Sequence, residues 1–143
     1  MESKENIRLS IIDKVKELNL PLGEYVVAGG GVLEALGIRE TNDVDIAVTP
    51  YLHKKLRETG EWEEEEKYGK VFLKQEKIDV IPQLDWEEYH TTTEEAIKTA
   101  TIIEGIPFMN LDELCKFKTA LGREKDFKDI EMIKEYQRIN SSL

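Results

Sequence analysis

Two stretches of sequence decide the fold of this protein. Residues 25–31 read Tyr25-Val26-Val27-Ala28-Gly29-Gly30-Gly31, and residues 43–46 read Asp43-Val44-Asp45-Ile46. The first is a short apolar run, typical of a buried strand, that leads directly into glycines; residues 32–36 then return to a helical pattern. Polarity alternates from residue 43 to residue 49, which predicts a second strand. A strand–turn–helix–strand unit is therefore expected near the start of the chain.

The flanking segments predict further helices and strands around this unit. Upstream, apolar residues at helical spacing predict an amphipathic N-terminal helix over residues 4–19. Downstream, the patterns predict a helix at 51–58, strands at 62–67, 70–75 and 77–81, and a helix that starts at Thr93. A short hairpin over residues 101–108 and two helices, 111–121 and 124–138, follow.

Together these elements predict a single domain over residues 1–143, of the α/β (α+β) class. We expect a small mixed β-sheet flanked by helices, with residues 22–85 as the catalytic core and residues 93–140 as a C-terminal hairpin and helices. Hydrophobic residues make up 40% of the chain. That proportion is enough for one core, and the length fits one domain.

Composition narrows the classes of partner. The formal net charge is −10, with acidic residues spread along the chain, so a phosphate backbone would be repelled and no long nucleic acid is expected as a partner. No apolar run approaches the ~20 residues that span a bilayer, which predicts no membrane association. One cysteine, Cys115, excludes an internal disulfide. We expect a cytoplasmic protein.

Asp43 and Asp45 are the first candidates for chemistry. Because side chains alternate along a strand, these two carboxylates share one face while Val44 and Ile46 share the other. Two carboxylates placed in this way can share or bridge a divalent cation, and hard oxygen ligands suit Mg²⁺, with Mn²⁺ as the alternative. Taken alone, an Asp-x-Asp pair is more often an exposed strand end.

Gly29 and Gly30 stand between the first strand and its helix. Glycine there lets the backbone approach a phosphate closely, and a helix start offers unpaired N–H groups. A tight turn that needs positive φ is the competing role. Combined with the aspartates on the next strand, the glycines predict that phosphates and metal meet between the two segments. The turn lacks the Gly-Lys-Ser/Thr of a Walker P-loop.

Residues 27–46 resemble the signature of the polymerase-beta-type nucleotidyltransferase superfamily. That signature is an apolar residue, Gly, then Gly or Ser, a gap of about a dozen residues, and Asp-apolar-Asp/Glu-apolar. Residues 37–42 and 120–130 are also similar to small bacterial stand-alone members, such as antibiotic-modifying or toxin–antitoxin-associated enzymes. The resemblance implies a nucleotidyltransferase-like fold. It also implies transfer of a nucleoside monophosphate, AMP by default, from a nucleoside triphosphate such as ATP to a hydroxyl of a small molecule or protein.

The family also implies a third carboxylate, on a later strand, that faces the same metals. Asp79 fits, because alternation places it opposite Ile78 and Val80. Asp43, Asp45 and Asp79 are thus the implied catalytic and metal-binding residues. Asp79 would serve as general base for the acceptor hydroxyl or as a metal ligand.

Arg39, Thr41 and Lys118 complete the expected nucleotide-binding set, with Gly29 and Gly30. Arg39 and Thr41 flank the site, where contact with phosphate and formation of a turn are alternatives. Lys118 falls within the apolar stripe of the helix at 111–121, so it must pair or extend to water. The sequence leaves open whether it reaches the triphosphate, a catalytic carboxylate or solvent. A structural ion-pair network is expected of most of Arg123, Lys125, Asp126 and Asp129.

The alternative function is a non-catalytic nucleotide- or partner-binding regulatory protein, antitoxin-like, on the same scaffold. Three carboxylates on one face favour catalysis, since a binding module has no need for them. The chain has little room for a domain that selects the acceptor. The acceptor site is therefore expected on the C-terminal helices or across an interface with a second copy or a partner protein.

Overall fold

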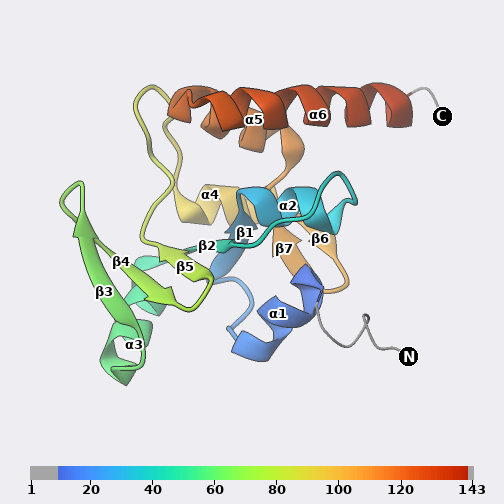
Figure 1. Ribbon diagram of the computed structural model, residues 1–143. Coiled ribbons are helices and arrows are strands. Elements are labelled where there is room, and N and C mark those ends of the chain that lie inside the picture. The colour runs from blue at the N-terminus through green and yellow to red at the C-terminus, as the bar shows by residue number, and fades with distance from the viewer. Residues whose placement is uncertain (1–9, 142–143) are drawn as a thin grey trace.

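A computed structural model describes residues 10–141, which contain a mixed seven-stranded sheet and six helices (Figure 1). The helices are α1 (Ile11–Leu18), α2 (Gly30–Ala35), α3 (Pro50–Thr59), α4 (Thr93–Lys98), α5 (Leu111–Leu121) and α6 (Glu124–Ser141). The strands are β1 (Tyr25–Ala28), β2 (Val44–Val48), β3 (Glu63–Lys67), β4 (Lys70–Gln75), β5 (Ile78–Ile81), β6 (Thr101–Ile103) and β7 (Ile106–Phe108). The predicted mixed architecture with C-terminal helices is confirmed.

The strands follow the order β3-β4-β5-β2-β1-β7-β6 across the sheet. Two neighbouring pairs, β2–β5 and β1–β7, are parallel, and the remaining pairs are antiparallel. Because β7 pairs with β1, the C-terminal hairpin is part of the same sheet as the predicted catalytic core. The strand that carries Asp45 lies in the middle of the sheet, between β1 and β5.

Helix boundaries follow from capping side chains. Ser10 and Thr49 cap α1 and α3, each accepting a hydrogen bond from a backbone N–H three residues on, and Pro50 occupies the first turn of α3. α4 begins at Thr93, as predicted, and Thr92 caps it by accepting a hydrogen bond from the Glu95 N–H.

Other boundaries differ slightly from the predictions. Of the predicted N-terminal helix, residues 4–9 lie outside the described range, and α1 begins at Ile11. α2 begins at Gly30, two residues earlier than its apolar pattern suggested, because the buried Gly29 takes the N-cap position. α6 extends to Ser141, beyond the predicted end at Arg138.

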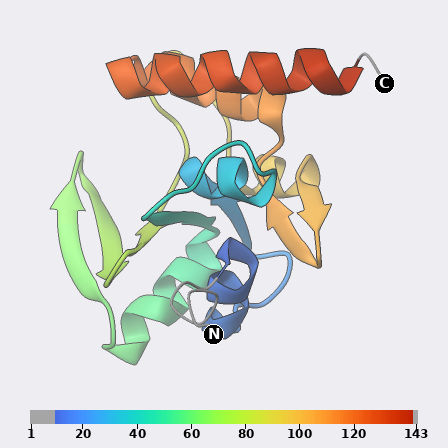
Figure 2. The same ribbon diagram turned by 45° about the vertical axis from the view of Figure 1, so that its right-hand side comes forward.

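The core lies around the two central strands. Every residue of β1 is buried, as are Val44, Ile46, Ala47 and Val48 of β2, which leaves Asp45 as the partly exposed position of that strand. α5 and α6 run together along one side of the molecule, and α1 and α3 lie on the opposite side (Figures 1 and 2). Burial of both strand faces explains why β1 and β2 read as nearly continuous apolar runs.

The two outer edges of the sheet are short or charged. β3 consists of Glu63 to Lys67, all exposed, and such charge at a sheet edge discourages pairing with another chain. No helix within residues 10–141 has both the length and the apolar character needed to cross a membrane.

Candidate active site

Asp45 and Asp79 stand side by side on neighbouring parallel strands. The register between β2 and β5 pairs Asp45 with Asp79, and the antiparallel pairing of β4 with β5 sets Lys74 opposite Asp79. Residues in register across a sheet project from the same face. Asp43, two residues before Asp45, shares that face at the exposed entrance to β2. The predicted grouping of Asp45 and Asp79 on one face is therefore confirmed.

The glycine turn lies directly against these residues. A Cβ placed on Gly29 would lie 2.5 Å from Oδ2 of Asp45, and one placed on Gly30 would lie 2.6 Å from Oγ1 of Thr41. Gly29 also has φ 62° and ψ −145°, a conformation that is essentially restricted to glycine. The positive-φ turn considered for this residue is thus present, and the missing side chain also lets Asp45 pack against it.

The Asp45 carboxylate has an unfavourable environment for its charge. Burial, followed by the nearby charges of Asp79 and Asp43, raises the pKa of Asp45 to about 6, although Lys118 and Lys125 partly oppose this rise. Among residues 10–141 it has no hydrogen-bond or ion-pair partner. A partly buried carboxylate that has no such partner and lies near two others favours a cation or a proton.

The three aspartates do not form a closed metal cage by themselves. Within the described chain no group of three or more His, Cys, Asp or Glu side chains could hold a metal ion. Mg²⁺ is commonly held by one or two carboxylates together with substrate phosphates and water, rather than by protein ligands alone. The chemistry of the Asp43, Asp45 and Asp79 donor set fits such a shared site.

Lys74 is a site residue that the sequence analysis missed. Its Nζ donates to Oδ1 of Asp79 at 3.1 Å, so the third carboxylate is paired with a cation. The alternation of β4 contained the signal: Lys70, Phe72 and Lys74 share one face, and a hairpin turn at Tyr68 and Gly69 fixes the strand that carries them. What the sequence could not supply was the register that sets Lys74 against Asp79.

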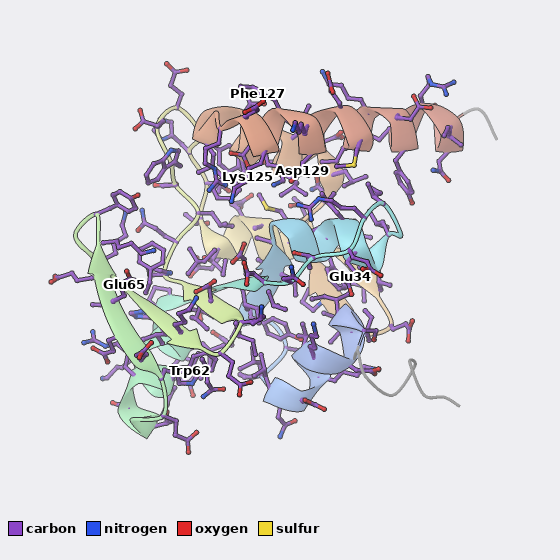
Figure 3. The ribbon with its side chains drawn as sticks, viewed as in Figure 1. Glu34, Trp62, Glu65, Lys125, Phe127 and Asp129 are labelled. Carbon is purple, nitrogen blue, oxygen red and sulfur yellow. The ribbon has the colours of Figure 1, made fainter. Side chains whose placement is uncertain are left out.

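Arg39 and Lys118 meet on a single carboxylate of α6. Asp129 accepts hydrogen bonds from Nε and Nη2 of Arg39, both at 2.8 Å, and pairs with Nζ of Lys118 at 2.9 Å. Asp129 lies on the side of α6 that faces the rest of the molecule, whereas Phe127 lies on the opposite side (Figure 3). Arg39 and Lys118, two of the residues predicted to bind the nucleotide, are therefore bound to α6 in this structure.

The structure rules out one of the alternatives considered for Lys118. Only 5% of the residue is exposed, so the interpretation in which it extends to solvent is wrong. Its other carboxylate neighbour is Asp126, which also accepts from Nε and Nη2 of Arg123 at 2.6 and 3.1 Å. The buried carboxylates of α6 neutralise Lys118, which removes the need to reach water. The predicted structural ion-pair network of Arg123, Asp126 and Asp129 is confirmed.

Burial and pairing act in opposite directions on the two network carboxylates. Burial alone would raise the pKa of Asp129 and of Asp126, but hydrogen bonds from Arg39 and Lys118 to the first, and from Arg123 to the second, outweigh it. Both pKa values lie below the ordinary value. The carboxylates of α6 are thus charged and paired, in contrast to Asp45.

Thr41 combines two backbone roles at the entrance to β2. Its N–H donates to Oε1 of Glu34 at 2.8 Å, and its hydroxyl donates to the carbonyl oxygen of Asp43 at 3.1 Å. These contacts form the turn that delivers Asp43, which is the turn-forming role proposed as an alternative to phosphate contact. Its hydroxyl also lies against Gly30.

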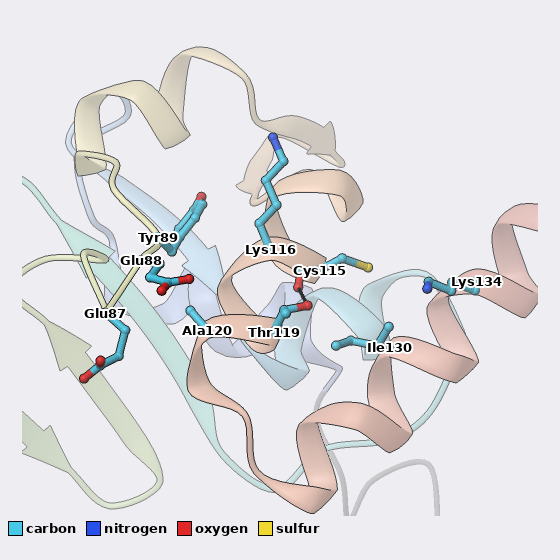
Figure 4. A pocket seen from close by; sticks show the side chains of 9 residues that line it. All are labelled: Glu87, Glu88, Tyr89, Cys115, Lys116, Thr119, Ala120, Ile130 and Lys134. Carbon is cyan, nitrogen blue, oxygen red and sulfur yellow. Dashed lines mark hydrogen bonds between the residues drawn. The ribbon is translucent and has the colours of Figure 1, made fainter.

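A cleft of about 520 Å³ opens above Asp45 and Asp79. Its lining comes from β4 and β5, from Phe117 and Leu121 of α5 with Arg123, and from Tyr68 and Trp86. A second cavity, of about 630 Å³, lies between α5, α6 and the loop at 87–89, and contains none of the predicted site residues (Figure 4). The cleft on the aspartates is therefore the candidate active site.

Comparison of the chain with protein-family models, curated proteins and solved structures found no match.

Proposed function

We propose that this chain is a metal-dependent nucleotidyltransferase. It transfers a nucleoside monophosphate, AMP by default, from a nucleoside triphosphate to a hydroxyl of a small molecule or protein. The observation that carries the proposal is the register of Asp45 with Asp79 on adjacent parallel strands, beside a glycine turn that touches Asp45. The resemblance of residues 27–46 to the superfamily signature supports the same conclusion.

Each residue has a distinct part in this reaction. Because Gly29 and Gly30 carry no side chains, Asp45 and Thr41 pack directly against the turn, and we assign the phosphate contact to the backbone of this turn. Asp43 and Asp45 would hold the divalent cation, Mg²⁺ or Mn²⁺, and Asp79 would complete the set. When bound, the cation supplies neutralisation of the phosphate charge.

The transfer itself balances without a further reactant. The acceptor oxygen forms a bond to the α-phosphorus while the bond to pyrophosphate breaks, and pyrophosphate leaves with the electron pair. The hydroxyl proton passes to the Asp79 carboxylate and then to solvent. Asp79 borders the cleft and has a partly exposed side chain, so a hydroxyl can approach it.

Calorimetric titration with ATP, GTP, CTP and UTP, with and without Mg²⁺, tests the donor site. We expect metal-dependent binding that the Asp43→Asn/Asp45→Asn variant loses and that the Asp112→Asn control retains, since Asp112 lies exposed on α5. If none of the four triphosphates binds, either with or without Mg²⁺, the donor-site proposal is wrong.

The ion pair of Lys74 with Asp79 favours a second candidate, a non-catalytic nucleotide- or partner-binding protein. Lys74 can neutralise Asp79 without any bound metal ion, at a donor–acceptor distance of 3.1 Å. Release of pyrophosphate separates the two functions. Turnover with a screened hydroxyl acceptor supports transfer, whereas tight triphosphate binding without pyrophosphate release across the screen supports the regulatory role.

A further inference from the structure

The strand face that carries Asp45 and Asp79 changes from charged to apolar two residues further along the strands. The row that contains Asp45 continues through Asp79 to Lys74, whereas the next row on the same face pairs Ile81 of β5 with Ala47 of β2. Phe72 lies two residues before Lys74 on β4 and faces the same side. Two residues along a strand span about 7 Å. An apolar surface therefore begins about 7 Å from the carboxylates.

Tyr68 lies beyond this apolar surface and is not part of the hydrophobic core. The residue is 69% exposed, at the tip of the β3–β4 hairpin, with φ 54° followed by Gly69 at φ 73°. Two successive positive φ values are typical of a two-residue type I′ hairpin turn, where Asn, Asp or Gly is usual. A large aromatic side chain in this strained and exposed position is not explained by folding.

Trp86 and Phe72 fix the Tyr68 ring in one orientation. The centroids of Tyr68 and Trp86 lie 4.8 Å apart with planes at 77°, and those of Tyr68 and Phe72 lie 6.5 Å apart at 73°. These edge-to-face contacts hold Tyr68 by its neighbours and leave most of it in solvent. All three rings line the cleft that contains Asp45 and Asp79.

Charged side chains of both signs lie beside these three rings. Nζ of Lys67 lies 5.1 Å from the centroid of Phe72 and pairs with Glu65 at 3.6 Å. Lys70, Arg123 and Asp85 also line the cleft. Rings combined with basic side chains are the usual surface for a flat π-system that carries negative charge nearby. The three rings thus suit one part of the reacting complex, and the carboxylates suit another.

We propose that Tyr68 and Trp86 form a ring-binding subsite, where a flat ring carried by one of the two reactants stacks in the same cleft that Asp45 and Asp79 line. The inference rests on the proposed nucleotidyl transfer for the identity of those reactants. The ring is either the nucleobase of the donor or a ring of the acceptor, and stacking is the chemistry common to both.

Fluorescence of Trp86 tests the first source. The chain has two tryptophans, so Trp62→Phe leaves Trp86 as the only one, and its emission is excited selectively over that of the tyrosines. This variant is titrated with magnesium ATP and, separately, with magnesium tripolyphosphate, which has no ring. If the base stacks, ATP changes the emission and tripolyphosphate does not. Tyr68→Ala then weakens ATP binding roughly tenfold and leaves tripolyphosphate binding unchanged. Tyr68→Phe retains the affinity, and Tyr51→Ala, an exposed tyrosine on α3, is the matched control.

The second source is tested on the complex with a non-hydrolysable ATP analogue. Phenyl β-glucoside is compared with methyl β-glucoside, which lacks the aromatic ring. A change in Trp86 emission with the phenyl compound alone, lost in Tyr68→Ala, assigns the subsite to the acceptor. If ATP, adenosine and phenyl β-glucoside all leave Trp86 unchanged, the ring-binding subsite is overturned.

The two proposals fail in different ways. Loss of the donor site appears as absence of triphosphate binding in calorimetry, including tripolyphosphate. In that case a response of Trp86 to adenosine that Tyr68→Ala abolishes would still support the ring subsite. Tripolyphosphate binding without any ring response would support the donor site and remove the subsite.

Discussion

Oδ2 of Asp45 occupies the space where a side chain on Gly29 would begin, 2.5 Å from the position of its Cβ. The glycine turn and the aspartate strand are therefore fitted to each other directly. Gly29 cannot gain a side chain without displacing the Asp45 carboxylate. The contact joins two parts of the sequence signature that are separated by a helix and a turn.

Gly29→Ala tests this contact. The added methyl group meets the Asp45 carboxylate and the positive φ strains the backbone, so we expect a loss of about 2–4 kcal/mol in unfolding free energy and loss of triphosphate binding. Gly37→Ala is the matched control, because Gly37 has φ 76° but nothing lies within 4 Å of its Cβ position. Urea denaturation of both variants measures the difference. Equal destabilisation would mean that the contact with Asp45 has no effect.

Asp45→Asn is expected to stabilise the protein at neutral pH. Burial, then Asp79 and Asp43, raise the pKa of Asp45 to about 6 from an ordinary value of 3.8. Between these pH values the folded state keeps a proton that the unfolded state has lost, so the stability of the wild type falls as pH rises from about 4 to about 6. The neutral amide avoids this loss, which we expect to be about 1–3 kcal/mol at pH 7.

Thermal or urea denaturation from pH 4 to pH 8 checks the sign. The difference between Asp45→Asn and wild type should grow between pH 4 and pH 6 and then level off, while Asp112→Asn should run parallel to wild type throughout. A difference that is constant with pH would contradict the raised pKa of Asp45.

Lys118→Met is expected to destabilise the protein by about 3 kcal/mol, because it leaves buried Asp129 and Asp126 with one fewer cation. Lys116→Met, on the same helix, is the control. Its ion pair with Glu113 at 3.2 Å involves a 64% exposed lysine side chain, and its loss should cost less than about 1 kcal/mol.

The destabilisation caused by Lys118→Met should also depend on pH. The pKa values of Asp129 and Asp126 are lowered on folding, so their stabilising contribution is present above the unfolded value of 3.8 and is lost as pH falls below it. The destabilisation measured by urea unfolding should therefore shrink below about pH 4. A cost that persists unchanged into acid would assign the effect to packing instead of charge.

Lys74→Met should leave stability nearly unchanged and alter cation binding. The Lys74 and Asp79 side chains are 45% and 33% exposed, so solvent screens the pair and it contributes little to stability. Removing the lysine leaves more negative charge at Asp79, and we expect severalfold tighter Mn²⁺ binding by electron paramagnetic resonance. Lys70→Met is the control, since Lys70 lines the same cleft without this pair. Weaker Mn²⁺ binding in Lys74→Met than in Lys70→Met would contradict this role.

The central part of the candidate site was predictable because strand periodicity is local. Alternation along residues 43–49 and 77–81 is enough to place Asp43 and Asp45 on one face, and Asp79 opposite Ile78 and Val80. The hairpin at 101–108 and the helix at 111–121 were likewise set by turn residues and apolar spacing.

Side-chain partners were less accessible, since they depend on register and on long-range packing. Lys118 could be placed on an inward face, but the choice between solvent and a buried carboxylate depended on where α6 lies. Lys74 acquired its role only through the pairing of β4 with β5.

The sequence by itself determined the strand–turn–helix–strand unit and the common face of its aspartates, because a repeat of two residues and glycine's conformational range act within a few residues of one another. Tertiary structure alone decided that Arg39 would bind Asp129, which is 90 positions away in the chain. It also decided that Tyr68 and Trp86 would meet over the cleft. Those contacts are fixed by how α6 and the β3–β4 hairpin pack, and that packing is a cooperative property of the whole sheet.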